Sequence, residues 1–227
     1  MSIRVQGNGG VVAAVDGTVY RALRVTMRPV DYGSHGSYRV SMSSDTLAAD
    51  FGSGFENDLF QARWTSSSLL ALVWRVQLDG MSGSDTAFAA GIAEFMLYRA
   101  TAWTVDGSGG ASAVLTGNNN KLRTSMATTS MGAIRISSTD ALVTGTRTTT
   151  QSFLRSQGGQ VFGVGTTPSV NYYGQVSLYG NAASTNLNNP SPMVLARNEG
   201  IVVTCLIPAT GTWRCGVTMS WSEVSSY

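Results

Sequence analysis

The chain contains two cysteines, Cys205 and Cys215, in the stretch IVVTCLIPATGTWRCGVTMSWSEV. Such a pair could form a disulfide, carry out redox chemistry or bind a metal. The spacing is not the C-x-x-C of a redox motif, and a zinc site needs three or four ligands, whereas His35 is the only histidine. We interpret both cysteines as small buried hydrophobic residues that stay reduced in a cytoplasm, with a disulfide formed outside the cell as the alternative.

No other group of residues has the types and spacing of a known catalytic site. His35 lies between glycines in DYGSHGSY, a setting typical of a turn, and no G-x-S-x-G motif accompanies it. The four glutamates form no local pair, although the paired carboxylates of a glycosidase can come from distant strands. The glycine-rich stretches FGSGFEND and DGSGGAS lack the phosphate-loop pattern. We therefore predict no catalytic residue, no metal site and no cofactor.

The overall charge is low. Charged residues make up 12% of the chain and its net charge is +2, whereas about 25% charged residues are usual. The cations are scattered and include a single lysine, Lys121, so we expect no nucleic-acid partner. No apolar stretch has the length of a signal peptide or a membrane span, so we expect no membrane association. A surface with few charges suits a protein that covers much of it with partners.

The cysteine segment also carries the strongest strand signal. Apolar and polar residues alternate strictly on both sides of PATGT, which has the composition of a turn. Folding the segment about Thr210 predicts a β-hairpin in which Cys205 lies opposite Cys215 and Ile207 lies opposite Trp213. One face of this hairpin is expected to be buried, and the other to meet solvent or a partner.

The rest of the chain predicts an all-β protein. In LLALVWRVQL the alternation places Leu70, Leu72, Trp74, Val76 and Leu78 on one face. The residues SDTLAADF (44–51) are expected to form one or two turns of helix. Further strands are expected at 19–27, 38–42, 59–64, 90–101, 133–137, 160–164, 170–179 and 193–196. We predict a single domain (1–227) with the fold of an antiparallel β-sandwich, jelly-roll-like, with long Gly/Ser/Asn-rich loops and little helix.

Two segments are candidates for protein contacts. The region 104–132 is long, weakly patterned and rich in Gly, Asn, Ser and Thr, so we expect it to serve a function or contact a partner; an ordinary surface loop is the alternative. The N-terminal segment 1–15 contains several glycines and could lie along a neighbour or add a strand to it. The candidate contact residues are Ile3, Arg4, Val5, Gln6, Asn8, Asn118, Lys121 and Arg123.

Three tyrosines are candidates for a receptor contact. Tyr172, Tyr173 and Tyr179 lie in NYYGQVSLYG, and exposed tyrosine beside Asn and Gly suits contact with carbohydrate or protein. Packing within the same chain is the alternative, because aromatic residues are mainly buried.

Three stretches resemble tailed-bacteriophage virion proteins of this length. These are IRVQGNGGVVAAVDGTVYRALRVTMRPVDYG near the N-terminus, TGNNNKLRTSM at 116–126, and LARNEGIVV with PATGTWRCGVTMSWSEV towards the C-terminus. The resemblance covers most of the chain and brings no catalytic residue with it. It implies a component of the virion, assembled in the cytoplasm of a bacterial host.

Within a virion, we expect a capsid decoration or cement protein. Its expected partners are the major capsid protein and copies of itself, with a trimer suited to the local threefold sites of a head lattice; we expect no small-molecule ligand. One alternative is a tail or head–tail component that binds a host receptor such as a glycan. Another is a sandwich that binds or cleaves glycans, which predicts an open aromatic groove.

Overall fold

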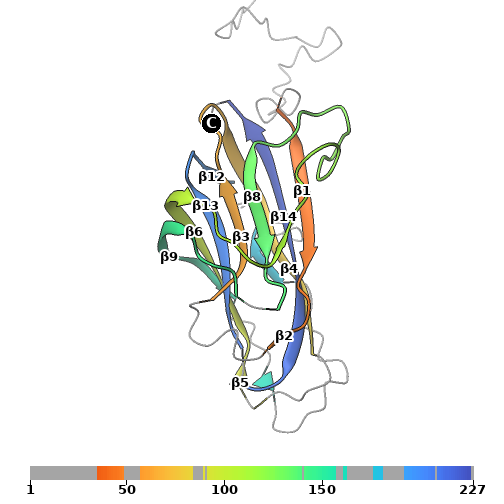
Figure 1. Cartoon of the computed structure of the whole chain (residues 1–227), viewed down its shortest axis with the longest axis vertical. Coiled ribbons are helices and arrows are strands. Elements are labelled where there is room, and N and C mark those ends of the chain that lie inside the picture. The colour runs from red at the N-terminus through yellow and green to blue at the C-terminus, as the bar shows by residue number, and fades with distance from the viewer. Residues whose placement is uncertain are drawn as a thin grey trace, which may run out of the picture.

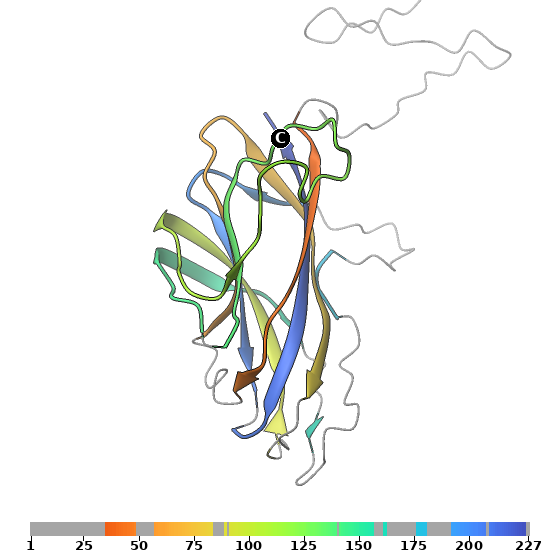
Figure 2. The ribbon, with the colours of Figure 1, turned by 45° about the vertical axis from the view of Figure 1, so that its right-hand side comes forward.

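The fold is an all-β antiparallel sandwich, in a computed structural model that describes residues 35–48, 57–83, 89, 91–139, 141–156, 161–162, 176–180, 192–207 and 209–225. These residues form fourteen strands and no helix. Figures 1 and 2 show two sheets facing each other as separate layers. The strand predicted at 19–27 and the N-terminal segment 1–15 lie outside the described residues. The jelly-roll strand order stays a prediction.

We name the two main sheets after their central strands. The β14 sheet has the order β1-β14-β4-β11, with β2 beside β14 and β12 beside β4. Its strands are β1 (Ser37–Ser43), β2 (Leu47–Ala48), β4 (Leu70–Gly83), β11 (Val176–Tyr179), β12 (Met193–Leu195) and β14 (Thr212–Val224). The β13 sheet has the order β7-β8-β3-β13-β6-β9. Its strands are β3 (Asp58–Trp64), β6 (Glu94–Val105), β7 (Ala111–Ser112), β8 (Met131–Ile136), β9 (Thr146–Ser156) and β13 (Gly200–Leu206). A separate pair joins β5 (Gly91–Ile92) to β10 (Val161–Phe162).

One hydrophobic core fills the space between the two sheets. Tyr38 of β1 stacks on Trp221 of β14, with ring centroids 5.4 Å apart. Phe95 of the β13 sheet meets Trp213 of the β14 sheet edge to face at 6.3 Å, so aromatic rings join the two layers. Each large apolar side chain that is fully buried contributes about 1.5–3 kcal/mol to stability. The core therefore holds the sheets together and fixes their edges in place.

The predicted hairpin of β13 and β14 is wrong in its pairing, although the residues predicted for its buried face do lie in the core. The opposite face is more buried than expected, since Val202, Thr204 and Thr218 are buried as well. β13 lies between β3 and β6, whereas β14 lies between β1 and β4, so the two strands belong to opposite sheets (Figure 1). Cys205 and Cys215 are both buried and face the same core from opposite layers. Alternation specifies which face of a strand is buried and leaves its hydrogen-bonded neighbour open. Each strand here gains two partners, because β14 pairs with both β1 and β4.

The predicted face of β4 is also corrected. Ala71 and Val73 join the core, and so do Val76 and Leu78, whereas Trp74 is half-buried and outside it. The register against β14 shifts between Ser220 and Trp221, which leaves Trp74 as the extra residue of a β-bulge. A bulge reverses the alternation of the strand. The strict period of two therefore holds on each side of Trp74 and fails across it.

The helix predicted at 44–51 is absent from its described part. Leu47–Ala48 form β2, which pairs with Thr212 and Trp213 of β14, and residues 49–51 lie outside the described residues. The side chain of Leu47 is fully buried in the core, and the Trp213 indole donates a hydrogen bond to the Ala48 carbonyl at 3.1 Å. These tertiary contacts override the weak local preference for helix.

Candidate functional site

The free edge of β1 is half covered by a loop. Tyr38 forms an antiparallel bridge with Lys121. On either side of the bridge, the Arg39 amide donates to the Asn120 carbonyl at 2.8 Å, and the Leu122 amide donates to the Ser37 carbonyl at 3.1 Å. Successive residues of a strand direct their backbone groups to opposite sides. Ser41 and Ser43 therefore direct their amides and carbonyls away from β14, as Ser37 and Arg39 do, beyond the part that the loop covers.

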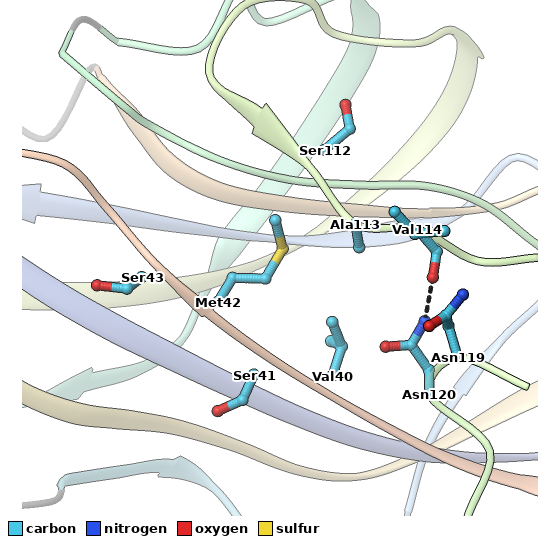
Figure 3. A pocket seen from close by; sticks show the side chains of 9 residues that line it. All are labelled: Val40, Ser41, Met42, Ser43, Ser112, Ala113, Val114, Asn119 and Asn120. Atoms are coloured by element: carbon cyan, nitrogen blue, oxygen red, sulfur yellow. Dashed lines mark hydrogen bonds between the residues drawn. The ribbon is translucent and has the colours of Figure 1, made fainter.

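A groove lies along this open half of the edge, and we call it the edge groove. Its volume is about 330 Å³. Figure 3 shows the side chains of Val40 and Met42 directed towards the segment of Ala113, whereas Ser41 points away. The groove therefore joins open backbone hydrogen-bonding groups to a partly apolar floor. Its lining is formed by Val40, Ser41, Met42, Ser43, Ser112, Ala113, Val114, Asn119 and Asn120.

The loop that forms the far wall of the edge groove is held by its own hydrogen bonds. Asn120 has a φ of 65°, a left-handed conformation that asparagine tolerates better than most residues. Its side-chain amide donates to the Val114 carbonyl at 2.6 Å, and the Asn119 side chain donates to the Thr116 carbonyl at 2.8 Å. Val114 is 63% exposed at the rim. These hydrogen bonds hold the wall in position, and the wall presents apolar as well as polar groups to the groove.

The structure brings the predicted contact loop to β1. Asn118 and Arg123 are exposed, and Lys121 is half-buried where it bridges Tyr38. Figure 2 shows the loop between β7 and β8 reaching over to β1, which is the strand drawn in orange. The sequence predicted β1 as a strand but gave no sign that Val40–Ser43 form an open edge. No local pattern distinguishes an edge strand from a central one here.

The other predicted contact residues are only partly described. Ile3, Arg4, Val5, Gln6 and Asn8 lie outside the described residues, as do Tyr172 and Tyr173. Tyr179 lies in β11, opposite Val76 of β4, and packs half-buried against the core. The alternative interpretation of this tyrosine, packing within its own chain, agrees with that position.

A buried ion pair that the sequence analysis missed lies in the β13 sheet. The Arg147 guanidinium donates to the Asp58 carboxylate at 2.5 Å, and the two side chains are 3% and 2% exposed. Arg147 also lies over the Trp103 ring, 4.9 Å from its centroid. Burial raises the pKa of Asp58 above its usual value, against the opposing effects of Arg147 and of a hydrogen bond from Gln61. Each of the two buried charges is thus neutralised by the other.

A small pocket of about 320 Å³ adjoins this pair. Tyr98, Thr144, Thr149, Val202 and Thr204 complete its lining. Among the residues that the structure describes, the charged groups of its lining are the paired Asp58 and Arg147.

A second buried carboxylate, Glu223, binds a loop to β14. It accepts hydrogen bonds from the Thr129 hydroxyl at 2.5 Å and the Ser130 amide at 2.9 Å. Burial raises the pKa of Glu223, and these hydrogen bonds oppose the rise. Burial, with a smaller contribution from Glu223, also raises the pKa of Tyr38 to about 12. Glu223 therefore serves as a structural acceptor beneath the loop that covers β1.

The cysteines and the histidine also have structural positions. Burial raises the pKa of Cys215 to about 12 and that of Cys205 well above its usual value, so both thiols are protonated at neutral pH. The His35 carbonyl accepts a hydrogen bond from the Tyr38 hydroxyl at 2.5 Å. In the described part of the chain, no cluster of three or more His, Cys, Asp or Glu residues has the geometry to hold a metal ion.

No family model, curated protein or solved structure matches the chain. Among the described residues, no helix has the length and apolar character needed to cross a membrane. The geometry is therefore the basis for assigning a role. An open strand edge beside a partly apolar groove can accept a further extended segment, by backbone hydrogen bonds and by side chains placed in the groove.

Proposed function

We propose that this protein is a non-enzymatic structural protein of a tailed-bacteriophage virion, which decorates the capsid and stabilises the head lattice through protein–protein contacts. The edge groove is the observation that supports the proposal. It offers the open amides and carbonyls of Ser41 and Ser43 beside Val40 and Met42. These are the features of a strand edge that binds an extended peptide rather than of a catalytic centre.

The energetics of such an edge suit a repeated lattice. A backbone hydrogen bond contributes about 0.5–1.5 kcal/mol net, so a contact of a few residues is weak by itself. Many copies on one particle, each binding more than one neighbour, multiply weak contacts through avidity. A protein that binds only the assembled lattice also shifts the equilibrium towards assembly. The proposed partners are the major capsid protein and further copies of this chain. The copies form a trimer in this proposal, and each copy has a jelly-roll strand order.

The copy number of the chain in purified virions tests this role. Quantitative mass spectrometry against the major capsid protein, combined with an averaged electron-microscopy map, measures copy number and location together. We expect hundreds of copies on the outer face of the head. A few to a few dozen copies at a vertex or the tail would overturn the decoration role and favour the receptor-binding alternative.

A heat test of particles links the role to the site. Particles that carry the Ser41→Pro variant are expected to release DNA at a lower temperature than particles with the Ser41→Ala variant. Both changes remove the hydroxyl, and only proline removes the outward amide. Equal release temperatures for the two variants would show that the edge groove does not contribute to stabilising the head.

A further inference from the structure

We propose that the pocket of about 320 Å³ beside Asp58 and Arg147 binds one ring of a neutral sugar. We call it the outer pocket. The inference goes beyond the proposed function and does not depend on it, because the edge groove lies on the other sheet. It also departs from the expectation, drawn from the sequence, that the chain binds no small molecule.

The outer pocket lies on the face of the β13 sheet that is turned away from the core. Val203 faces the core, so its neighbours Val202 and Thr204 point to the opposite side, where both line the pocket. These two side chains are buried and form the floor. Thr144 and Thr149 are exposed and form the rim. Exposed side chains change rotamer rapidly, which gives a ligand access to the floor.

The floor contains polar groups without a partner. Thr204 is 5% exposed, and its hydroxyl makes no hydrogen bond with the residues that the structure describes. The Nε atom of Arg147 is likewise buried without a hydrogen bond to them. Such groups cost stability unless a ligand or an ordered water bonds to them. The volume of about 320 Å³ exceeds that of a single water and lies at the lower end of small-molecule sites, which span about 300–1,000 Å³.

The balance of charge favours a neutral ligand. The two charged groups in the described lining are Asp58 and Arg147, which are bonded to each other at 2.5 Å. A charged ligand would lose its hydration here without gaining an unpaired counter-charge. A ligand with hydroxyl groups and no charge avoids this cost.

The rest of the lining matches the surface of a sugar ring, which has hydroxyl groups at its edge and C–H groups on its faces. The hydroxyls of Thr144, Thr149 and Thr204 can each donate and accept a hydrogen bond. Val202 and the Tyr98 ring supply apolar surface for the C–H groups. The Tyr98 hydroxyl already donates to a methionine sulfur at 2.9 Å, so its oxygen can still accept a hydrogen bond. With one aromatic ring in the described lining, the outer pocket suits a single sugar ring rather than a long chain of them.

A β-bulge in β6 holds the arginine in place. The register between β6 and β9 shifts around Ala102, which has a φ of 50°, a left-handed conformation that alanine rarely adopts. Regular alternation would place Trp103 on the face opposite Ala100, whereas both belong to one buried cluster. The bulge therefore turns the Trp103 ring beneath the Arg147 guanidinium, which lies 4.9 Å from the ring centroid. Strained backbone of this kind persists where the surrounding structure holds it, and it is common at ligand sites.

Titration of the full-length protein with monosaccharides tests the inference. The probes are glucose, galactose, mannose and N-acetylglucosamine, which are neutral, and N-acetylneuraminic acid, which is an anion; saturation-transfer NMR measures binding. We expect a dissociation constant of about 1 mM for at least one neutral sugar, the affinity usual for a ligand of about a dozen heavy atoms. The anion should bind about tenfold more weakly. The inference is overturned if no neutral sugar binds at concentrations about tenfold above this constant, or if the anion binds as well as they do.

A variant in the floor separates binding from stability. Thr204→Val replaces the hydroxyl by a methyl group of similar size, so sugar affinity should fall about fivefold or more. The melting temperature without sugar should not fall, because the hydroxyl has no partner in the described part of the protein. Thr148→Val, at an exposed residue of β9 outside the lining, is the matched control and should change the affinity by less than about twofold.

Thr149→Val at the exposed rim provides a second variant that leaves the floor unchanged, and it should weaken binding about threefold. Unchanged affinity in both Thr204→Val and Thr149→Val would overturn the inference, since the sugar would then bind elsewhere. A lower melting temperature of sugar-free Thr204→Val would also count against it, because the hydroxyl would then serve the fold.

Discussion

Replacing Arg147 by methionine should destabilise the protein strongly and in a pH-dependent way. The change removes the 2.5 Å bond to Asp58, the hydrogen bond to the Thr144 carbonyl at 3.0 Å and the contact with the Trp103 ring. Asp58 is left buried with Gln61 as its remaining side-chain donor. Removing one partner of a buried ion pair costs about 3–5 kcal/mol. For a chain of this size, the melting temperature should fall by about 6–20 °C.

The pH dependence follows from the carboxyl group. The pKa of Asp58 is already raised by burial, and Arg147 opposes that rise. In the variant the folded-state pKa rises further, so the folded protein holds a proton at pH values where the unfolded chain has released it. The loss of stability is therefore largest at neutral pH and becomes smaller as the pH falls through the raised pKa.

Urea unfolding followed by tryptophan fluorescence measures this effect between pH 5 and pH 8. The double variant Arg147→Met with Asp58→Asn should recover most of the loss, because no unpaired charge is left buried. Arg123→Met, a change at an exposed arginine, is the matched control and should alter the unfolding free energy by no more than about 0.5 kcal/mol. The reasoning fails if Arg147→Met costs less than about 1 kcal/mol at pH 7, or if its cost is the same at pH 5.

Three further predictions concern other parts of the fold. In Glu223→Gln the buried carboxyl can no longer ionise; because burial raises its pKa, wild-type stability should fall relative to this variant as the pH rises above about 4.5. Urea midpoints from pH 4.5 to 7 measure the difference, and a trend in the opposite direction would contradict it. Cys205 and Cys215 should react with a thiol reagent at pH 8 only after denaturation, and rapid labelling of the folded protein would show that they are accessible. Gly180→Ala should lower the melting temperature, since Gly180 has a φ of 69° and an added β-carbon would overlap the Trp74 carbonyl; an unchanged melting curve would argue against that close approach.

The sequence predicted the layers of the fold better than its connections. Alternation in 201–224 identified the buried faces of β13 and β14, because burial acts on each residue separately. It did not identify their partners, because a hairpin and a connection between two facing sheets bury the same residues. The bulge at Trp74 was also beyond prediction, because a single extra residue depends on how β4 pairs with β14.

The candidate site was harder to predict than the fold. The walls of the edge groove come from 40–43 and from 112–120, which only the folded topology brings together. The long region 104–132 was expected to serve a function, and its low patterning was the one signal available. Asp58 and Arg147 lie 89 positions apart, and neither has a neighbour in sequence that indicates the pairing. Contacts of this kind depend on strand order, which local patterns do not encode.

The central positions of β13 and β14 impose an order on synthesis. They are the last two strands that the structure describes, yet β13 joins β3 to β6 and β14 joins β1 to β4. While the ribosome is still making residues 200–224, the nascent chain carries the strands on either side of β13 and β14 without these two connecting strands. Both sheets lack their central connection until residues 200–224 have been made, and chaperones protect such chains during this period. A premature stop codon before Gly200 would therefore divide both layers rather than shorten the protein at one edge.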